Sequence, residues 1–310
     1  MSSKIEKPLR IGFVPEHFSA PLVFAKKHFN LDCSLIPFPS GTGHMVTSLQ
    51  AGELDMAVGL TEGWISAICK AEVARKNPGF KLVGTYVRSP LRWAISTGAG
   101  RDDIKGIADL KGGVVGVSRM GSGSYVMSYM LAMQQGWVKP MAGEHSPFQV
   151  EELNTFGRLR EGVNDKTADF FMWEYFTTKR YYDNGELKHI GDVYTPWPSW
   201  MIVASSQLAQ PVGSTGHETV LDTLQKVDEG IKYFQKNQEE AVEYISTKMD
   251  YSEADAREWL KTVEFQQHVN SLNAEEVRDV IKFLVSAGAI PEKSLDGDLF
   301  HNRAKFGNHS

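Results

Sequence analysis

Three glutamates of this 310-residue chain, Glu16, Glu62 and Glu174, each follow a short apolar segment directly. Two carboxyl groups in one cleft could serve as a general acid and a general base, or they could bind an amine or ring nitrogen of a ligand. The plainer interpretation of each is an exposed glutamate in a loop. Their shared position after apolar segments makes all three candidate ligand-binding residues.

Two turns rich in glycine and serine each lead into a predicted helix. They are Ser40-Gly41-Thr42-Gly43 and Gly121-Ser122-Gly123-Ser124. Glycine permits close backbone approach, and unpaired N–H groups at a helix start suit a carboxylate, sulfonate or phosphate. Neither turn completes a G-x-G-x-x-G pattern, and no nucleoside-triphosphate loop is present. The alternative is that the serines only cap their helices.

Aromatic residues gather in the same predicted loops, where their faces could stack on a flat ring or attract a cation. Trp173 precedes Glu174, Trp197 lies between two prolines, and Trp200 begins an apolar segment that favours a structural role. The complete set of candidate ligand-binding residues is Glu16, His17, Ser40, Gly41, Thr42, Thr61, Glu62, Ser118, Gly121, Ser122, Gly123, Ser124, Trp173, Glu174 and Trp197.

The remaining chemistry-bearing residues exclude several classes of protein. The histidines show no metal-binding spacing, and G-x-S-x-G is absent, so we predict no metal, no cofactor and no catalytic residue. Arg88, Arg92 and Arg119 could meet an anion, although surface ion pairs are the plainer expectation. Cys33 and Cys69 are expected to be small buried thiols. With 33 basic against 38 acidic residues the formal net charge is −5, which disfavours nucleic acid and anionic membranes as partners.

The elements that must position these residues alternate between short apolar strands and amphipathic helices, the pattern of an α/β protein. Two apolar strands, Arg92–Thr97 and Trp200–Ser205, flank a second αβ run, and we expect them to cross between two lobes. After Ser205 the pattern is helical. The predicted division is residues 1–94 plus 201–310 for the first lobe and 95–200 for the second. The other predicted strands are Leu9–Val14, Cys33–Phe38, Leu54–Leu60, Lys81–Tyr86, Gly113–Val117, Phe170–Trp173 and Lys188–Asp192.

Several motifs resemble the type 2 periplasmic-binding-protein fold. Ser40-Gly41-Thr42-Gly43 and Gly52-Glu53-Leu54-Asp55-Met56-Ala57-Val58 resemble its first lobe, and Asp109-Leu110-Lys111-Gly112 resembles its entry to the second. Phe171-Met172-Trp173-Glu174 and Thr195-Pro196-Trp197-Pro198 are similar to a signal-less cytosolic fungal subgroup, related to binding proteins for sulfonates, taurine and thiamine-pyrimidine precursors. The resemblance implies an α/β fold of two lobes with a double hinge crossing and C-terminal helices.

The resemblance also implies a mechanism in which two hinged lobes close on one ligand. We expect a compact small molecule with an anionic group at Gly121–Ser124 and a flat, (hetero)aromatic part near Trp173 and Glu174. The alternative is an enzyme of thiamine-pyrimidine or vitamin-precursor metabolism, although the cysteine cluster of such synthases is missing here. With neither an apolar leader nor a membrane span in the sequence, we expect a cytoplasmic protein. The oligomeric state and any transporter or signalling partner stay open.

Overall fold

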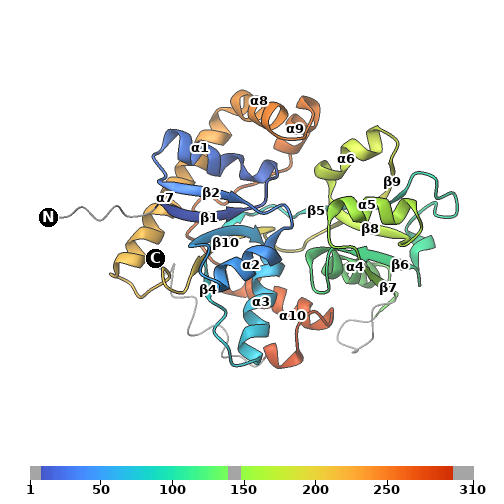
Figure 1. Ribbon diagram of the computed structural model, residues 1–310, viewed down its shortest axis with the longest axis horizontal. Helices are drawn as coiled ribbons and strands as arrows, with labels where there is room; N and C mark the ends of the chain where they lie inside the picture. The colour runs from blue at the N-terminus through green and yellow to red at the C-terminus, as the bar shows by residue number, and fades with distance from the viewer. Residues whose placement is uncertain (1–7, 139–147, 296–310) are drawn as a thin grey trace.

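Two five-stranded sheets lie side by side in the computed structural model, which describes residues 8–138 and 148–295 (Figure 1). The first has the strand order β2-β1-β3-β10-β4, and the second β7-β6-β8-β5-β9. The strands of the first sheet are β1 (Leu9–Phe13), β2 (Cys33–Pro37), β3 (Met56–Leu60), β4 (Phe80–Val87) and β10 (Trp200–Ser205). Those of the second are β5 (Arg92–Gly98), β6 (Val114–Val117), β7 (Gln149–Glu152), β8 (Phe170–Glu174) and β9 (Leu187–Tyr194).

Each sheet combines four strands that run in one direction with one antiparallel strand that arrives from the other lobe. In the first sheet β1 pairs in parallel with β2 and β3, and β10 runs antiparallel between β3 and β4. In the second, β6 pairs in parallel with β7 and β8, and β5 runs antiparallel between β8 and β9. The carboxyl ends of the parallel strands therefore share one edge with the first residues of β10 and β5.

The chain crosses between the lobes in two short segments, residues 88–91 and 195–199, which are hydrogen-bonded to one another. The Leu91 amide donates to Thr195 Oγ1 at 2.9 Å, and the Thr195 amide donates to the Leu91 carbonyl at 3.2 Å. Ser199 Oγ donates to the Ser89 carbonyl at 2.7 Å. The structure corrects one expectation: strands 92–97 and 200–205 do not cross, because strand pairing places each wholly within one sheet.

The predicted lobe limits, 1–94 plus 201–310 and 95–200, lie close to these segments and stay predictions. Strand pairing assigns Arg92, Trp93 and Ala94 to the second sheet and Trp200 to the first. The strand β7 was not predicted, because its sequence Gln-Val-Glu-Glu is polar and three of its four side chains are exposed at the sheet edge. Sequence patterns indicate a strand chiefly through buried apolar residues, and an edge strand has few of them.

Helices cover both sheets, and the C-terminal ones belong to the first lobe (Figure 1). The first lobe holds α1 (Ala20–His28), α2 (Thr42–Gln50), α3 (Thr61–Val73), α7 (Thr215–Lys236), α8 (Gln238–Lys248), α9 (Glu253–Leu260) and α10 (Ala274–Ser286). The second holds α4 (Gly123–Gln134), α5 (Phe156–Asn164) and α6 (Tyr175–Asp183). Three short 3-10 turns are η1 (His17–Ser19), η2 (Ile107–Leu110) and η3 (Glu292–Leu295).

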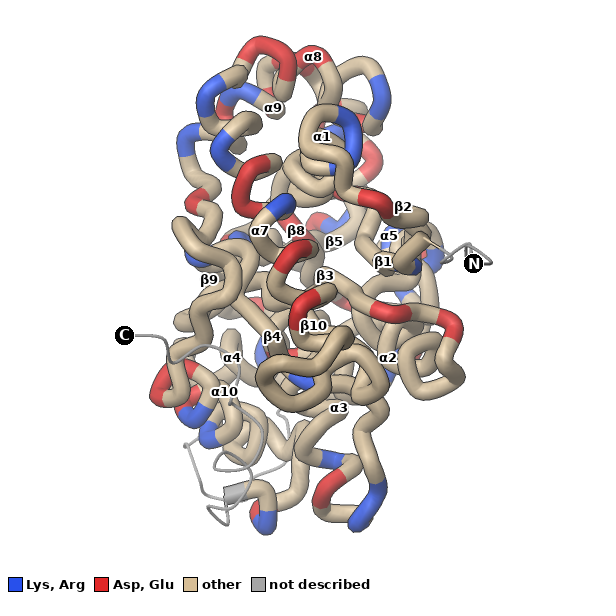
Figure 2. Tube along the Cα trace, turned by 90° about the vertical axis from the view of Figure 1, so that its left-hand side faces the viewer, with Lys and Arg blue, Asp and Glu red and all other residues tan. Residues whose placement is uncertain are grey.

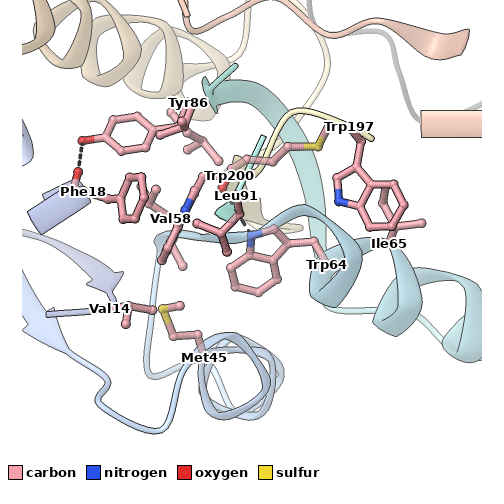
Figure 3. Close-up of a cluster of buried hydrophobic side chains, with 14 of the residues drawn as sticks. Val14, Phe18, Met45, Val58, Trp64, Ile65, Tyr86, Leu91, Trp197 and Trp200 are labelled. Carbon is pink, nitrogen blue, oxygen red and sulfur yellow. Dashed lines mark hydrogen bonds between the residues drawn. The ribbon is translucent and has the colours of Figure 1, made fainter. Parts of the chain in front are cut away.

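The core of the first lobe is built from large aromatic and aliphatic side chains between the sheet and its helices (Figure 3). Trp64 and Tyr86 are fully buried, and each satisfies its polar atom. Trp64 Nε1 donates to the Met201 carbonyl at 3.2 Å, and the Tyr86 hydroxyl donates to the Phe18 carbonyl at 2.9 Å. Because a buried polar atom without a partner is costly, these bonds fix α3 against β10 and β4 against η1.

Charged residues are interspersed along the chain, as the alternation of acidic and basic residues on α8 and α9 shows (Figure 2). The described part of the chain contains no helix that is both long and apolar enough to span a membrane. Cys33 and Cys69 are both buried free thiols, as predicted.

Candidate functional site

A cavity with about 960 Å³ of empty space, part of it open to solvent, lies between the two lobes. Its walls come from the loops that follow β1, β2 and β6, from the ends of β3 and β8, from α3, and from the start of α2 and α4. Ligands of open α/β sheets bind beyond the carboxyl ends of the strands, and here two such edges face one cavity. The sheet topology therefore explains why residues far apart in sequence meet.

Most of the predicted site residues line this cavity. Those from the first lobe are Glu16, Ser40, Gly41 and Thr42, and those from the second are Ser118, Gly121, Ser122, Gly123, Ser124, Trp173 and Glu174. Their placement brings the two glycine-rich turns and two of the three glutamates together. Whether each contacts a ligand stays a prediction.

Three predicted residues instead attach the second crossing segment to α3. The Thr61 hydroxyl donates to the Pro198 carbonyl, and the Thr61 amide donates to the Ser199 carbonyl at 3.1 Å. Trp197 Nε1 donates to Glu62 Oε2 at 3.2 Å. All three predicted residues, Thr61, Glu62 and Trp197, are buried and lie outside the cavity lining. These bonds attach the crossing segment 195–199 to the first turn of α3.

His17, the fourth predicted residue outside the lining, lies in an aromatic cluster beneath the cavity. Its ring centroid is 4.2 Å from that of Trp259 and 4.5 Å from that of Tyr251. Neither ring nitrogen has a hydrogen-bond partner among the described residues. Burial lowers the pKa of His17 well below its usual value, so the ring is neutral. Its Nε2 atom nevertheless lies 3.8 Å from Glu174 Oε1.

The α4 turn presents a helix N-terminus to the cavity. Ser122 is the N-cap, and its Oγ accepts the Tyr125 amide at 3.4 Å. Ser124 Oγ lies 2.9 Å from Ser122 Oγ and accepts the Ser118 amide at 3.2 Å. Ser122 therefore caps this helix, as the alternative interpretation held, whereas Ser124 binds the loop before it. The first-turn N–H groups still offer positive potential. In the other turn Gly41 is the N-cap of α2, without a side-chain bond.

Two cations, Lys70 on α3 and Arg119 in the β6–α4 loop, line the cavity from opposite lobes. Lys70 Nζ lies 2.9 Å from the position that a Cβ on Gly121 would take, and a Cβ on Gly43 would overlap the Arg119 guanidinium. Arg119 Nη1 also donates to the Ser40 carbonyl at 3.4 Å. Neither cation forms an ion pair with a carboxylate in the described part of the chain. Each cation thus approaches a glycine of the opposite lobe.

The environment lowers the pKa of both cations. For Lys70 the larger cause is desolvation and the smaller is the nearby charge of Arg119, while for Arg119 desolvation outweighs the attraction of Glu152. A bound anion would compensate both effects. Sequence reasoning missed Lys70 because this residue lies more than two helical turns after the end of β3. Its side chain lines the cavity because α3 runs along the cavity wall.

Two carboxyl groups, Glu16 after β1 and Glu174 at the end of β8, line the cavity from opposite lobes. Burial, followed by the neighbouring Glu174, raises the pKa of Glu16 to about 8. Burial raises the pKa of Glu174 to about 7, against the opposing effect of hydrogen bonds from Thr177. Thr177 donates to Glu174 Oε2 through its amide at 2.7 Å and its hydroxyl at 2.9 Å.

Two tryptophans outside the predicted ligand-binding set, Trp93 and Trp200, begin or nearly begin the two antiparallel strands and line the cavity. Trp93 lies opposite Glu174 in the second sheet, and Trp200 lies opposite Leu60 in the first. The indole nitrogens of both are buried without a partner among the described residues. Local sequence pattern did not reveal this placement, because it depends on which sheet each strand joins.

Arg88 and Arg92 pair with carboxylates outside the cavity lining, as the plainer expectation held. Arg88 lies 3.1 Å from Glu276, and Arg92 lies 2.8 Å from Asp192. Within residues 8–138 and 148–295, no cluster of three or more histidine, cysteine or acidic side chains could hold a metal ion.

Comparison with known proteins matches residues 93–193 to a family described as Ca3427-like PBP. The solved structure of the conserved Candida albicans CA3427 gene product is 39% identical and has a TM-score of 0.79, covering 93% of this chain and 94% of that one. That protein is described as defining a new family with the generic periplasmic-binding-protein fold. Comparison with curated proteins found no match.

Two bacterial proteins share the fold at lower identity. The alkanesulfonate-binding protein SsuA from Xanthomonas axonopodis pv. citri, bound to MOPS, is 15% identical with a TM-score of 0.73, covering 94% of this chain and 96% of that one. The periplasmic aliphatic sulphonate binding protein SsuA from Escherichia coli is 19% identical with a TM-score of 0.67 and the same coverage. At these identities the likeness establishes the two-lobed fold alone.

Proposed function

Because this chain belongs to the family of the Candida albicans CA3427 gene product, with its generic periplasmic-binding-protein fold, we propose that it binds one compact anionic molecule between its lobes. The observation that carries the proposal is the pair Lys70 and Arg119, which enter one cavity from opposite lobes without a carboxylate partner among the described residues. An anion held by both would link the lobes, and its release would free them to open at the hinge.

The helix start at α4 adds to this anion site. The first-turn N–H groups of α4 and the positive end of its dipole favour a negative group near Gly121 to Ser124. The Lys70 ammonium reaches this turn from α3, so the dipole and one full charge act on the same place. A sulfonate, a phosphate and a carboxylate share the chemistry that this arrangement recognises.

The aromatic walls fit a ligand with a flat or apolar body. Trp93, Trp173 and Trp200 line the cavity together with Leu91 and Val14. Ligand pockets are typically apolar with a few placed polar groups, which is the composition found here. The enzymatic alternative in vitamin-precursor metabolism gains no comparable support, since the two cysteines are buried in separate elements.

The proposal is tested by thermal shift followed by calorimetry with matched alkyl sulfonates, phosphonates and carboxylates. We expect one of these classes to bind, and Lys70→Met and Arg119→Met each to weaken its binding by about 10- to 100-fold, the equivalent of a hydrogen bond to a charged group. The matched controls are Lys76→Met and Arg158→Met, which remove exposed cations outside the cavity lining.

Two results would contradict the proposal. One is the failure of all three anion classes to bind the wild-type protein. The other is binding that survives both cavity substitutions unchanged, because an anion that ignores Lys70 and Arg119 is bound elsewhere.

A further inference from the structure

The carboxyl groups of the cavity lie apart from its cations. The charge of Glu174 raises the pKa of Glu16, and the charge of Arg119 lowers the pKa of Lys70. Neither Lys70 nor Arg119 is among the groups that shift the pKa of Glu16 or Glu174. The contacts agree, because Lys70 approaches Gly121, whereas Glu174 approaches His17. One cavity thus has a basic end and an acidic end.

Within the described residues, no lysine or arginine forms an ion pair with Glu16 or Glu174. The titratable groups that face this end are His17 from η1, Arg92 from β5, Tyr182 from α6 and Tyr251 from the segment before α9. His17 is neutral, and burial keeps the pKa of Tyr251 well above its usual value. Arg92 is already paired with Asp192 at 2.8 Å, and its guanidinium lies 3.4 Å above the Tyr175 ring.

The two carboxyl groups come from opposite lobes, and Glu174 is held in place by hydrogen bonds. Glu174 is 5% exposed, and the Thr177 amide and hydroxyl fix one of its oxygens at the start of α6. The Thr177 hydroxyl is itself 3.0 Å from the Tyr251 hydroxyl. Glu16 follows β1 in the other lobe and shares the cavity with Trp173. A pair of carboxyl groups in a largely desolvated cavity, beside aromatic faces, is the arrangement that attracts an organic cation.

We infer that Glu16 and Glu174 form a binding site for a cationic nitrogen, so that the ligand is a zwitterion with its anion at Lys70 and Arg119. This inference rests on the proposed function, because it assigns the second end of the same cavity. The ligand would then contact both lobes at both ends, and a closed state would leave none of the four charges without a partner. A ligand with only an anion would leave the carboxyl end uncompensated.

When a cation binds at this site, the carboxyl pair releases a proton. In the empty cavity the pair holds at least one proton near pH 7, because burial and mutual repulsion disfavour the charged forms. An ammonium group favours the ionised carboxylates. The carboxyl O–H bond therefore breaks, the proton leaves to the buffer, and the nitrogen keeps its own charge. We expect release of about one proton per ligand at pH 7.

The test uses pairs of probes that differ only at one end, such as 3-aminopropane-1-sulfonate against butane-1-sulfonate. The corresponding phosphonate and carboxylate pairs form the other arms. Calorimetry of the full chain in buffers of different ionisation enthalpy measures both affinity and proton release. We expect the amino probe to bind about 10- to 100-fold more tightly than its alkyl counterpart. In Glu16→Gln and Glu174→Gln this preference should fall below about threefold and the proton release should disappear, while exposed Glu275→Gln changes neither.

The outcomes separate the two proposals. If an alkyl anion binds as tightly as its amino counterpart and still depends on Lys70, the cation site is wrong and the anion site stands. An amino preference that survives both glutamate substitutions also overturns the inference. Failure of every probe overturns both proposals. Should Glu174→Gln not fold, the wild-type proton count and Glu16→Gln still decide the question.

Discussion

At the scale of single residues, Glu62 is a buried carboxyl group that binds the second crossing segment. It is 1% exposed, Oε2 accepts the Trp197 indole, and Oε1 has no partner among the described residues. Burial raises its pKa to about 7. A carboxyl group whose pKa is higher in the folded than in the unfolded state stabilises the fold most at low pH, and this contribution is lost as pH rises through both values.

We therefore predict that Glu62→Gln flattens the pH dependence of stability. Between about pH 4.5 and 7 the wild-type free energy of unfolding should fall, relative to that of the variant, by up to about 3 kcal/mol. Glutamine keeps an oxygen for the Trp197 indole but cannot ionise. Denaturant unfolding across this range measures the effect, with exposed Glu275→Gln as the control. Parallel pH profiles for the wild type and Glu62→Gln would show that Glu62 is ionised in the folded protein.

The cavity-lining residues that directly follow strands could be predicted from the sequence. Glu16, Glu174 and the Gly121–Ser124 turn were selected on that ground, and all line the cavity. The same rule selected Glu62, yet the helical turn of α3 directs its side chain toward Trp197. A strand end fixes the position of a residue near the ligand edge, whereas the first turn of the following helix decides which side chain faces it.

At the scale of elements, α2 and the β6–α4 loop approach closely because position 43 has no side chain. A Cβ there would overlap the Arg119 guanidinium, although Gly43 lies within a helix, where alanine is the better residue. Gly157 on α5 offers a matched site, since the nearest atoms to a Cβ there lie at 3.9 and 4.0 Å.

We predict that Gly43→Ala weakens anion binding by about tenfold or more, because it displaces Arg119, while stability is unchanged or rises by up to about 1 kcal/mol. Gly157→Ala should leave affinity unchanged. Calorimetry and thermal unfolding of both variants measure this contrast. Equal affinities in the two variants would show that the contact between Gly43 and Arg119 has no role in binding.

The order of strands and helices along the chain could largely be predicted from the sequence. The pairing partners of strands 92–97 and 200–205 could not. Apolar periodicity indicates that residues 92–97 and 200–205 are strands, but it carries no information on which sheet takes them. The structure answers through register: Trp93 lies opposite Glu174, and Trp200 lies opposite Leu60. Trp93 and Trp200 consequently reach the cavity, a placement that depends on long-range pairing rather than on local pattern.

At the scale of the whole molecule, the lobes touch on both sides of the cavity. On one side Arg119 reaches the Ser40 carbonyl. On the other, α6 contacts the segment around α9: Lys179 lies 3.2 Å from Asp255, and Arg180 pairs with Asp250. The sequence resemblance implied two hinged lobes, whereas these contacts join residues 70 or more positions apart and required the folded chain.

The most direct test of the account is an NMR titration of the deuterated full chain with 3-aminopropane-1-sulfonate and its phosphonate and carboxylate counterparts. Glycine amides report on both lobes, through Gly41 and Gly43 in the first and Gly121 and Gly123 in the second. We predict that one probe shifts all four amides with a single dissociation constant, while Gly157 stays unchanged. Shifts confined to one lobe, or none with any probe, would contradict a ligand held between the two lobes.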